Sequence, residues 1–312
     1  MVILKKLGQL LVTVILVTLF ASFLLELLPG DPVEVVAPFG SDEQRAEIRE
    51  ELGLDQPFVV RYTTWLGNFA TGNLGKYYDS SNDVSTRVGD ALPVSLTLMI
   101  YAQLLALIIA IPVGVIAAYR SGSWFDRLSS TSAFAMLAIP TFALGFVLQY
   151  YLAVKLGWFK ATGYTPLTEN PVKHVQTVVL PVITLAVGQV AVYMRLLRSD
   201  MIATLQQDFI MMAKAKGLKN KRILFRHALR PSSLTLLTVA GLNVGTLIGG
   251  ALIVEVVFKI PGMGYLLAEA IGSRQIVAFQ SIVAIIAIFY VLVNFVVDIL
   301  YSTLDPRIRH GK

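Results

Sequence analysis

The sequence has no cysteine, only three histidines and few charged side chains. Without cysteine the 312 residues can form no disulfide, no thiolate metal site and no thiol nucleophile. His174, His227 and His310 are too scattered along the chain to suggest a metal site. Charged residues make up 15% of the chain, against about 25% in soluble domains. This composition excludes a disordered chain and argues against a soluble enzyme.

A phosphate-binding P-loop is also absent. The pattern G-x-x-x-x-G-K-[ST] would need a serine or threonine after Gly75-Lys76, and Tyr77 follows instead. The chain therefore cannot bind ATP through this motif, and any ATP-driven process that it serves needs the phosphate chemistry in another subunit.

Long uncharged runs dominate what is present, and the mean hydropathy is +0.69. A helix needs about 20 apolar residues to cross a bilayer. The uncharged runs of 18 residues or more are Leu7–Leu25, Ala91–Tyr119, Leu128–Val154, His174–Met194, Pro231–Val254 and Gln275–Val297. A chain of this size cannot cover six such helices as a buried core. The sequence therefore predicts an all-α membrane protein with six transmembrane helices, the first of them too long for a signal-peptide core.

The basic residues are distributed unevenly between the connections. The segments 1–6, 120–127, 195–230 and 305–312 hold 16 Lys and Arg but four Asp and Glu. The intervening segments 31–90, 155–173 and 259–274 hold ten basic and 13 acidic residues. Because cytoplasmic segments carry the excess of Lys and Arg, both termini are predicted to be cytoplasmic. The pI near 9.4 then reflects orientation in a membrane, not nucleic-acid binding.

The first long connection, 31–90, is expected outside and contains two predicted helices. Ser41 is a helix N-cap signal, the first helix should run to Leu52, and Gly53 should end it. The second segment, Phe58 to Phe69, repeats apolar residues at helical spacing, as an interfacial or docking helix does. This subdomain either caps the outer mouth or contacts substrate, and the sequence leaves both open.

The second long connection, Arg195 to Arg230, is expected in the cytoplasm. Asp208 is predicted to cap a short helix from Phe209 to Lys216, with Gly217 as its left-handed end. Asn220 should start a second helix that ends at Leu229, and Pro231 should introduce the fifth crossing.

The first of these two helices is expected to place Phe209, Met212 and Ala213 on one side. Apolar residues on a short surface helix suit a groove on a partner protein. A basic segment lying on anionic lipid headgroups is the alternative.

Several ordered motifs run through these segments. The cytoplasmic loop reads Asp208-Phe-Ile-Met-Met-Ala213-Lys-Ala-Lys-Gly217 and then His227-Ala-Leu-Arg-Pro231. The outside loop reads Leu52-Gly-Leu-Asp-Gln-Pro57, Trp65-Leu-Gly67 and Gly72-Asn-Leu-Gly75. Later come Gly249-Gly-Ala-Leu-Ile-Val-Glu255-Val-Val-Phe258, Pro261-Gly262-Met-Gly264 and Leu304-Asp-Pro-Arg-Ile-Arg309. Over nearly its whole length the chain resembles the permease subunits of bacterial binding-protein-dependent ABC importers, in the dipeptide, oligopeptide and nickel branch.

The resemblance implies a type I importer permease in the bacterial inner membrane. Its implied partners are a second related permease, two ABC ATPase subunits and an extracytoplasmic substrate-binding protein, with ATP and Mg²⁺ bound by the ATPases and no cofactor in this chain. The cytoplasmic loop is similar to the family's EAA loop, although this chain has Met211 at the position of the glutamate in that motif. The residues implied at this ATPase-coupling site are Asp208, Phe209, Met212, Ala213, Gly217, His227 and Pro231.

The expected division of the chain follows the two sides of the membrane. Residues 1–30 form the first transmembrane helix and 31–90 an extracytoplasmic loop subdomain. Residues 91–304 form a five-helix permease core with the cytoplasmic coupling loop 199–231, and 305–312 form a cytoplasmic tail.

Small and polar residues within the crossings are the candidates for helix packing or for the translocation pathway. They are Gly241, Asn243, Gly245, Gly249, Glu255 and Asp298. Glycines four residues apart let helices approach closely, and a smooth pathway wall is the alternative. Asp298 is expected to pair with Arg195 or Arg198, and Glu255 to lie at the outer mouth.

An ion-gradient-driven secondary carrier is the competing class of function. It favours internal inverted repeats and charged relays near the bilayer midplane, and the sequence displays neither convincingly. Peptides are the first choice of substrate because the resemblance is strongest to dipeptide and oligopeptide permeases. Nickel or another small solute remains the alternative within the branch.

Overall fold

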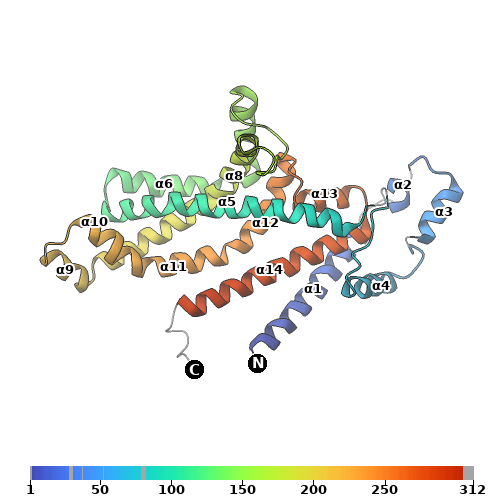
Figure 1. Ribbon diagram of the computed structural model, residues 1–312, viewed down its shortest axis with the longest axis horizontal. Helices are drawn as coiled ribbons and strands as arrows, with labels where there is room; N and C mark the ends of the chain where they lie inside the picture. The colour runs from blue at the N-terminus through green and yellow to red at the C-terminus, as the bar shows by residue number, and fades with distance from the viewer. Residues whose placement is uncertain (1, 28–30, 37, 52, 79–81, 305–312) are drawn as a thin grey trace. The chain divides into compact units, whose positions relative to one another are not determined.

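The computed structural model describes residues 2–27, 31–36, 38–51, 53–78 and 82–304, and these fold almost entirely as helices (Figure 1). Within these ranges the β-structure is limited to one isolated bridge between Lys76 and Asp83. The predicted cytoplasmic tail, 305–312, lies outside the described residues. The all-α class predicted from the uncharged runs is confirmed.

Four of the described helices are long and apolar enough to cross a membrane as single spans. They are α1 (Val2–Glu26), α5 (Val84–Tyr119), α8 (Pro171–Leu205) and α14 (Ile276–Leu304). Two bent pairs supply further spans if each pair counts as one, which brings the total among the described residues to six.

The first bent pair joins α6 (Trp124–Ala138) to α7 (Thr141–Leu148) and the π-helix η1 (Gln149–Lys155), with a bend of 100°. Pro140 causes the break, because proline lacks an N–H and its ring forces the preceding residue out of the helical region. Ile139 is accordingly extended, with ψ at 120°.

The second bent pair is milder. The helices α10 (Asn220–Arg222), η2 (Ile223–Ala228) and α11 (Leu229–Leu242) run on from one another, and α12 (Val244–Phe258) follows at 45°. Asn243 lies at this bend and serves as the C-cap of α11 and the N-cap of α12.

By packing, the chain divides into two compact units, of which the first is Met1–Ser95 with Pro261–Leu292. Its core has two clusters of buried apolar side chains. One joins residues of α1, α5, α14 and α13 (Met263–Gly272), such as Leu25, Val88 and Leu266. The other packs the aromatic face of α4 (Phe58–Ala70) against α1 and α14, through Tyr62 and Trp65.

The predicted helices of the first long connection are confirmed. The helix α3 (Asp42–Glu51) begins with a reciprocal cap, in which Gln44 N–H donates to Ser41 Oγ at 3.3 Å and Ser41 N–H donates to Gln44 Oε1 at 3.0 Å. Gly53 follows with φ at 61°, whereas the predicted helix end, Leu52, lies outside the described residues. The short α2 (Pro32–Val36) precedes α3.

Buried polar contacts fasten this connection to the long helices of the first unit. Trp65 Nε1 donates to Ser281 Oγ at 3.0 Å, and Ser281 Oγ donates to the Leu74 carbonyl at 2.8 Å. Gln280 Nε2 of α14 donates to Ser22 Oγ of α1 at 3.0 Å. Since buried polar groups weaken a fold unless they are paired, these contacts fix the position of α4 against α1 and α14.

The second unit comprises Leu96–Ile260 and Val293–Lys312. Its centre is α8, against which α6, α7, α11 and α12 pack. Fifteen residues of α8 are buried, including Pro181 and Tyr193. The predicted division of the chain followed the sides of the membrane, not packing, and stays a prediction.

Candidate coupling site

The short helix α9 (Asp208–Ala215) begins one residue earlier than predicted. Gln207 is its N-cap, with no side-chain cap bond, so Asp208 is not the cap. The extended backbone at Gln207 starts the helix, and Asp208 occupies the first turn. The carboxylate of Asp208 is therefore near the positive end of the helix dipole.

The end of α9 confirms the role predicted for Gly217. Its φ is 72°, a left-handed conformation that glycine adopts without a Cβ penalty. Leu218 N–H donates to the Ala213 carbonyl at 3.2 Å, and Gly217 N–H donates to the Lys214 carbonyl at 2.9 Å. These two bonds form a Schellman motif, which ends a helix and reverses the chain.

Burial divides the residues of α9 differently from the prediction. Ala213 is 7% exposed and lies on the inward side with Ile210, which is fully buried. Phe209 and Met212 are 46% and 58% exposed. The spacing places Ala213 on the same side of the helix as Phe209 and Met212, but Ala213 lies at the edge of that side and packs inward beside Ile210. The exposed face, formed by Phe209, Met211 and Met212, is called the α9 patch below.

The helix predicted from Asn220 to Leu229 does not end at Leu229, which corrects the prediction. After α10 the backbone becomes π-helical through η2 and continues into α11, so Pro231 lies in the first turn of α11. Proline has no N–H to donate to the preceding turn. The π-helical turn ahead of Pro231 is wider than an α-helical turn and accommodates the proline without that hydrogen bond. His227 lies half-buried in η2, and its Nε2 is buried without a partner within the described ranges.

Two hydrogen bonds tie this segment to the long helices. Asn220 Nδ2 donates to Tyr119 Oη at the end of α5, at 2.8 Å. Thr204 Oγ1 at the end of α8 and Ser232 Oγ of α11 share a bond of 2.9 Å. The first bond joins α10 to α5, and the second joins α8 to α11.

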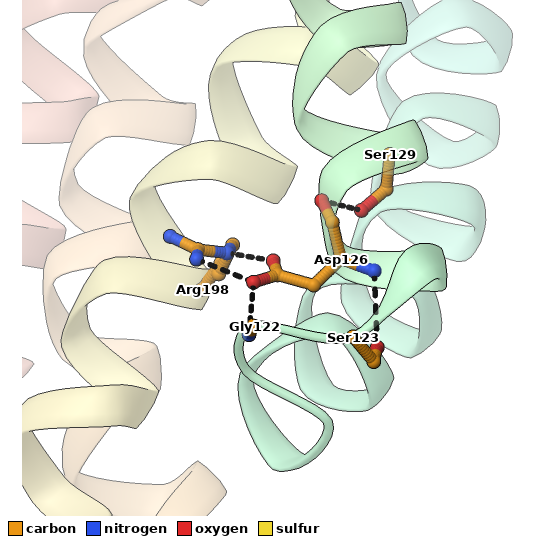
Figure 2. A network of polar contacts seen from close by, with 5 residues as sticks. All are labelled: Gly122, Ser123, Asp126, Ser129 and Arg198. Atoms are coloured by element: carbon orange, nitrogen blue, oxygen red, sulfur yellow. Dashed lines mark hydrogen bonds and ion pairs between the residues drawn. The ribbon is translucent and has the colours of Figure 1, made fainter.

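A charged network that sequence reasoning missed lies in the same unit. Figure 2 shows the Asp126 carboxylate of α6 facing the Arg198 guanidinium of α8. Arg198 Nη2 donates to Asp126 Oδ2 at 2.8 Å, Arg198 Nε donates to Oδ1, and Gly122 N–H donates to Oδ2 at 2.8 Å. Asp126 is 4% exposed. A buried carboxylate with three donors is fully satisfied, so the network clamps α6 to α8.

A local signal for this network exists in the sequence. Ser123 is followed three residues later by Asp126, a spacing typical of a helix N-terminus. In the structure Asp126 N–H donates to Ser123 Oγ at 3.4 Å, and Ser129 Oγ donates to the Asp126 carbonyl at 3.0 Å. The signal predicts the start of α6 but not the partner, since Arg198 lies 72 residues further on.

The candidate packing glycines do not act as one stripe. A Cβ at Gly241 would lie 2.7 Å from Val297 Cγ1, so α11 and α14 approach closely there. Gly245 is buried, and Gly249 is exposed with no atom of the chain within 4 Å of a Cβ. The bend at Asn243 separates Gly241 from the other two. Close helix packing is thus found at Gly241 but not at Gly249, although the four-residue repeat predicted it at both.

The structure describes the side chain of only one of the two acidic candidates in the crossings, Glu255 and Asp298. Glu255 is fully buried in α12. The side chain of Asp298 lies outside the described residues. Of its two expected partners, Arg198 binds Asp126, and the Arg195 guanidinium lies 4.2 Å from the centre of the Phe134 ring.

The intramembrane glutamines hold helices together. Gln103 Oε1 accepts from Tyr193 Oη at 3.1 Å, and Gln103 Nε2 donates to the Ala240 carbonyl at 3.3 Å. Gln149 Nε2 donates to the carbonyls of Ala161 and Val257 at 2.7 and 3.1 Å. Such bonds join α5, α8 and α11, and anchor η1 to the end of α12.

Two family models match the chain. Residues 110–310 match the binding-protein-dependent transport system inner membrane component, and residues 1–99 match the N-terminal membrane component of the same transport systems. Together they match residues of both packing units, leaving 100–109 and 311–312 unmatched.

Full-length relatives carry names from peptide transport. The di/tripeptide transport system permease DppB of Pseudomonas aeruginosa is 37% identical, over 99% of this chain and 98% of the relative. The oligopeptide transport system permease AppB of Bacillus subtilis is 37% identical, over 94% of each chain. The dipeptide transport system permease DppB of Alkalihalophilus pseudofirmus is 31% identical, over 98% of each chain.

A solved structure shares the fold. A chain of the inward-facing MetNI methionine ABC transporter matches with a TM-score of 0.56 at 18% identity, over 70% of this chain and 96% of that chain. At this identity the likeness establishes the fold alone. It confirms the type I importer permease fold that the resemblance implied.

Proposed function

Because the chain belongs to the inner membrane components of binding-protein-dependent transport systems, we propose that it forms half of the translocation pathway of an ATP-driven peptide importer. It is a multi-pass protein of the bacterial inner membrane. The observation that carries the peptide assignment is the full-length match to permeases named for di/tripeptide, dipeptide and oligopeptide transport.

The other subunits supply what this chain lacks. A second related permease completes the pathway, two ABC ATPases bind ATP and Mg²⁺, and an extracytoplasmic binding protein delivers the substrate. The absence of a P-loop from this chain supports the assignment of ATP binding to other subunits. The permease itself is proposed to hold no cofactor and to catalyse no reaction.

Coupling to the ATPases is assigned to α9. The α9 patch presents exposed apolar side chains on a short helix, and such a helix docks into an apolar groove of a partner. Lys214 and Lys216 beside it match the excess of basic residues on the side proposed as cytoplasmic. Both chain termini then lie in the cytoplasm.

Movement of the docked helix reaches the membrane helices through the contacts described above. The Asn220–Tyr119 bond links α10 to α5, and the Asp126–Arg198 network keeps α6 and α8 together. Closure of the ATPase dimer then tilts these helices as a group and changes the side to which the pathway opens.

Purification from the native membrane in mild detergent tests the assembly. We expect a second permease and P-loop ATPases in the purified particle, with ATP hydrolysis that a peptide-loaded binding protein stimulates. A monodisperse particle that contains this chain alone and takes up solute along an ion gradient would support a secondary carrier and contradict the proposal.

A further inference from the structure

The second packing unit contains a cavity of about 270 Å³ where the ends of α5 and α8 meet α9, α10 and η2. Sites for drug-sized ligands measure roughly 300–1,000 Å³, so this cavity is too small for such a ligand. It suits one small group, such as a phosphate ester or a single side chain of a partner.

The lining is apolar at the floor of the cavity and polar at its rim. The floor residues are buried or half-buried, and they are Ala118, Ile202, Leu205, Ile223 and Leu224. The rim residues are exposed, and they are Tyr119, Ser121, Gln206, Lys214 and Asn220. A ligand that fits both parts has a polar head and an apolar continuation.

The rim carries one positive charge and no carboxylate. Lys214 supplies this charge, and among the described residues it forms no ion pair. A ligand ammonium would therefore meet a cation here and no carboxylate. The charge of the rim favours an anionic head over a zwitterionic one.

The rim also presents hydrogen-bond donors from several elements. Asn220 Nδ2 donates to Tyr119 Oη at 2.8 Å, which holds α10 beside the end of α5. The hydroxyl hydrogen of Tyr119 and the second amide hydrogen of Asn220 remain for another acceptor, and the Lys214 ammonium has three donors. Phosphate oxygens are suitable acceptors, because hydrogen bonds between charged groups are the strong ones.

The cavity lies at the level where membrane spans end. The apolar helix α5 ends at Tyr119, which is 48% exposed, and Trp124 at the start of α6 is 75% exposed. Tyrosine and tryptophan collect at the level of the lipid headgroups. Basic pockets between transmembrane helices on the cytoplasmic side bind anionic headgroups, and this cavity has those properties.

The cavity and the α9 patch use different side chains of α9. Lys214 lines the cavity, whereas none of the three residues of the α9 patch does. A lipid in the cavity and an ATPase on the patch therefore do not compete for the same side chains. The two interpretations that the sequence left open for this basic segment then apply to different residues.

We propose that the cavity binds the headgroup of an anionic phospholipid, with Lys214 contacting the phosphate and the apolar floor contacting the glycerol and the first acyl carbons. The assignment to the cytoplasmic leaflet rests on the proposed function, and the preference for an anionic head rests on the cavity alone. The bound lipid joins α5, α8, α9 and α10 at the base of the coupling site.

Native mass spectrometry tests the site. The complex is purified through this chain in a neutral detergent, delipidated and titrated with phosphatidylglycerol. Saturable binding is expected, at least tenfold tighter than that of phosphatidylcholine or phosphatidylethanolamine with the same acyl chains. Equal affinity for the three lipids would overturn the proposal. Displacement of the lipid by glycerol 1-phosphate at the same affinity would overturn a lipid as the source of the phosphate.

The variants K214Q and K216Q separate this cavity from general surface charge. Both remove one exposed lysine from the same segment, but Lys216 lies outside the lining. K214Q should weaken phosphatidylglycerol binding at least tenfold, and K216Q should leave the affinity within twofold of the wild type. Equal losses in the two variants would show a diffuse basic surface and overturn the site.

The variants Q206E and Q207E add a carboxylate inside and outside the cavity. Both glutamines are exposed, and only Gln206 belongs to the rim. Q206E should weaken binding because its carboxylate pairs with Lys214 and repels the phosphate, whereas Q207E should not. Without lipid the unfolding midpoint of each variant should match that of the wild type. Phosphatidylglycerol should raise the midpoint in the wild type and in the two controls only, and a rise in Q206E equal to that of the wild type would overturn the site.

An ATPase side chain in the cavity is the competing occupant. It predicts that K214Q and Q206E lose the ATPase subunits during purification while phosphatidylglycerol binding stays at the wild-type level, and this result would overturn the proposal. Uptake in vesicles that contain phosphatidylglycerol keeps the two claims apart. Peptide uptake by a complex that binds no phosphatidylglycerol would refute the site and leave the proposed function intact. No peptide uptake would refute the proposed function, whatever lipid the cavity binds.

Discussion

Single residues carry the sharpest constraints in the connection between α8 and α11. Gly217 reverses the chain after α9 with a left-handed backbone, and a Cβ there would meet no atom within 4 Å. Space therefore does not select glycine at this position, and the backbone conformation does. A β-branched residue would be strained by about 1–3 kcal/mol, so the turn would open or shift.

The first prediction concerns this turn. G217V should leave ATP hydrolysis in the assembled complex but reduce peptide uptake per ATP at least fivefold, because α9 is displaced. The matched control is G163V, a glycine with φ at 92° and open space around it in another loop of the same unit. Both variants strain a turn, and only G217V should uncouple. Wild-type coupling in G217V would contradict the role of α9.

The Asp126–Arg198 network makes a second residue-scale prediction. D126N should lower the free energy of unfolding by about 2–3 kcal/mol, which is less than the roughly 3–5 kcal/mol for a fully buried pair because Arg198 keeps 28% side-chain exposure. The double variant D126N/R198Q should cost less than the two single changes together. Thermal unfolding in detergent measures both.

The Arg87–Glu269 pair provides the control for this cycle. Its carboxylate is 42% exposed, and such pairs contribute about 0–1 kcal/mol. E269Q should therefore change the unfolding midpoint little. Strictly additive effects of D126N and R198Q would show that the two side chains do not act as a pair.

At the scale of elements, α9 packs one face inward and leaves the other exposed. Its inward face, Ile210 and Ala213, anchors the helix, and the α9 patch is left exposed. The sequence predicted the existence and the end of this helix because both depend on local signals. It did not predict that Ala213 would be buried while Phe209 and Met212 stay exposed, because burial depends on packing against η2 and the neighbouring helices.

The third prediction tests the α9 patch. The variant F209S/M212S should keep the unfolding midpoint of the purified permease, since both side chains are already exposed, and should lose the ATPase subunits during purification. I210S is the matched contrast, because a fully buried isoleucine replaced by serine should lower the midpoint. Full recovery of the ATPases with F209S/M212S would contradict docking through this patch.

The bent spans mark the limit of hydropathy. Uncharged runs predicted the spans that contain α6–α7 and α11–α12. They did not predict the bends, because a run of apolar residues indicates that a segment lies in an apolar environment and not which path its backbone takes. The 100° bend followed from Pro140, which the sequence displays. The 45° bend at Asn243 has no comparable local signal.

At the scale of the whole molecule, composition and the length of the uncharged runs predicted the helical fold and the candidate spans that the described residues display. The grouping of Met1–Ser95 with Pro261–Leu292 in one packing unit was beyond sequence reasoning. Contacts such as Trp65 with Ser281 join residues 216 apart, and neither residue type announces its partner.

Orientation in the membrane makes the fourth prediction. The absence of cysteine allows single cysteines to be introduced without background. D42C in α3 should react with a membrane-impermeant maleimide on intact cells, and K216C should react only after permeabilisation, since both positions are exposed in the structure. Labelling of K216C on intact cells would place the basic loop outside and reverse the proposed topology.

ATP-driven peptide uptake is the most direct test of the central claim. The purified complex is reconstituted in liposomes with ATP enclosed and its binding protein outside, and entry of a labelled dipeptide is followed over time. Uptake that requires both ATP and the binding protein, and that G217V reduces, is the predicted result. Uptake driven by an ion gradient without ATP, or no peptide uptake by a complex that hydrolyses ATP, would contradict the account.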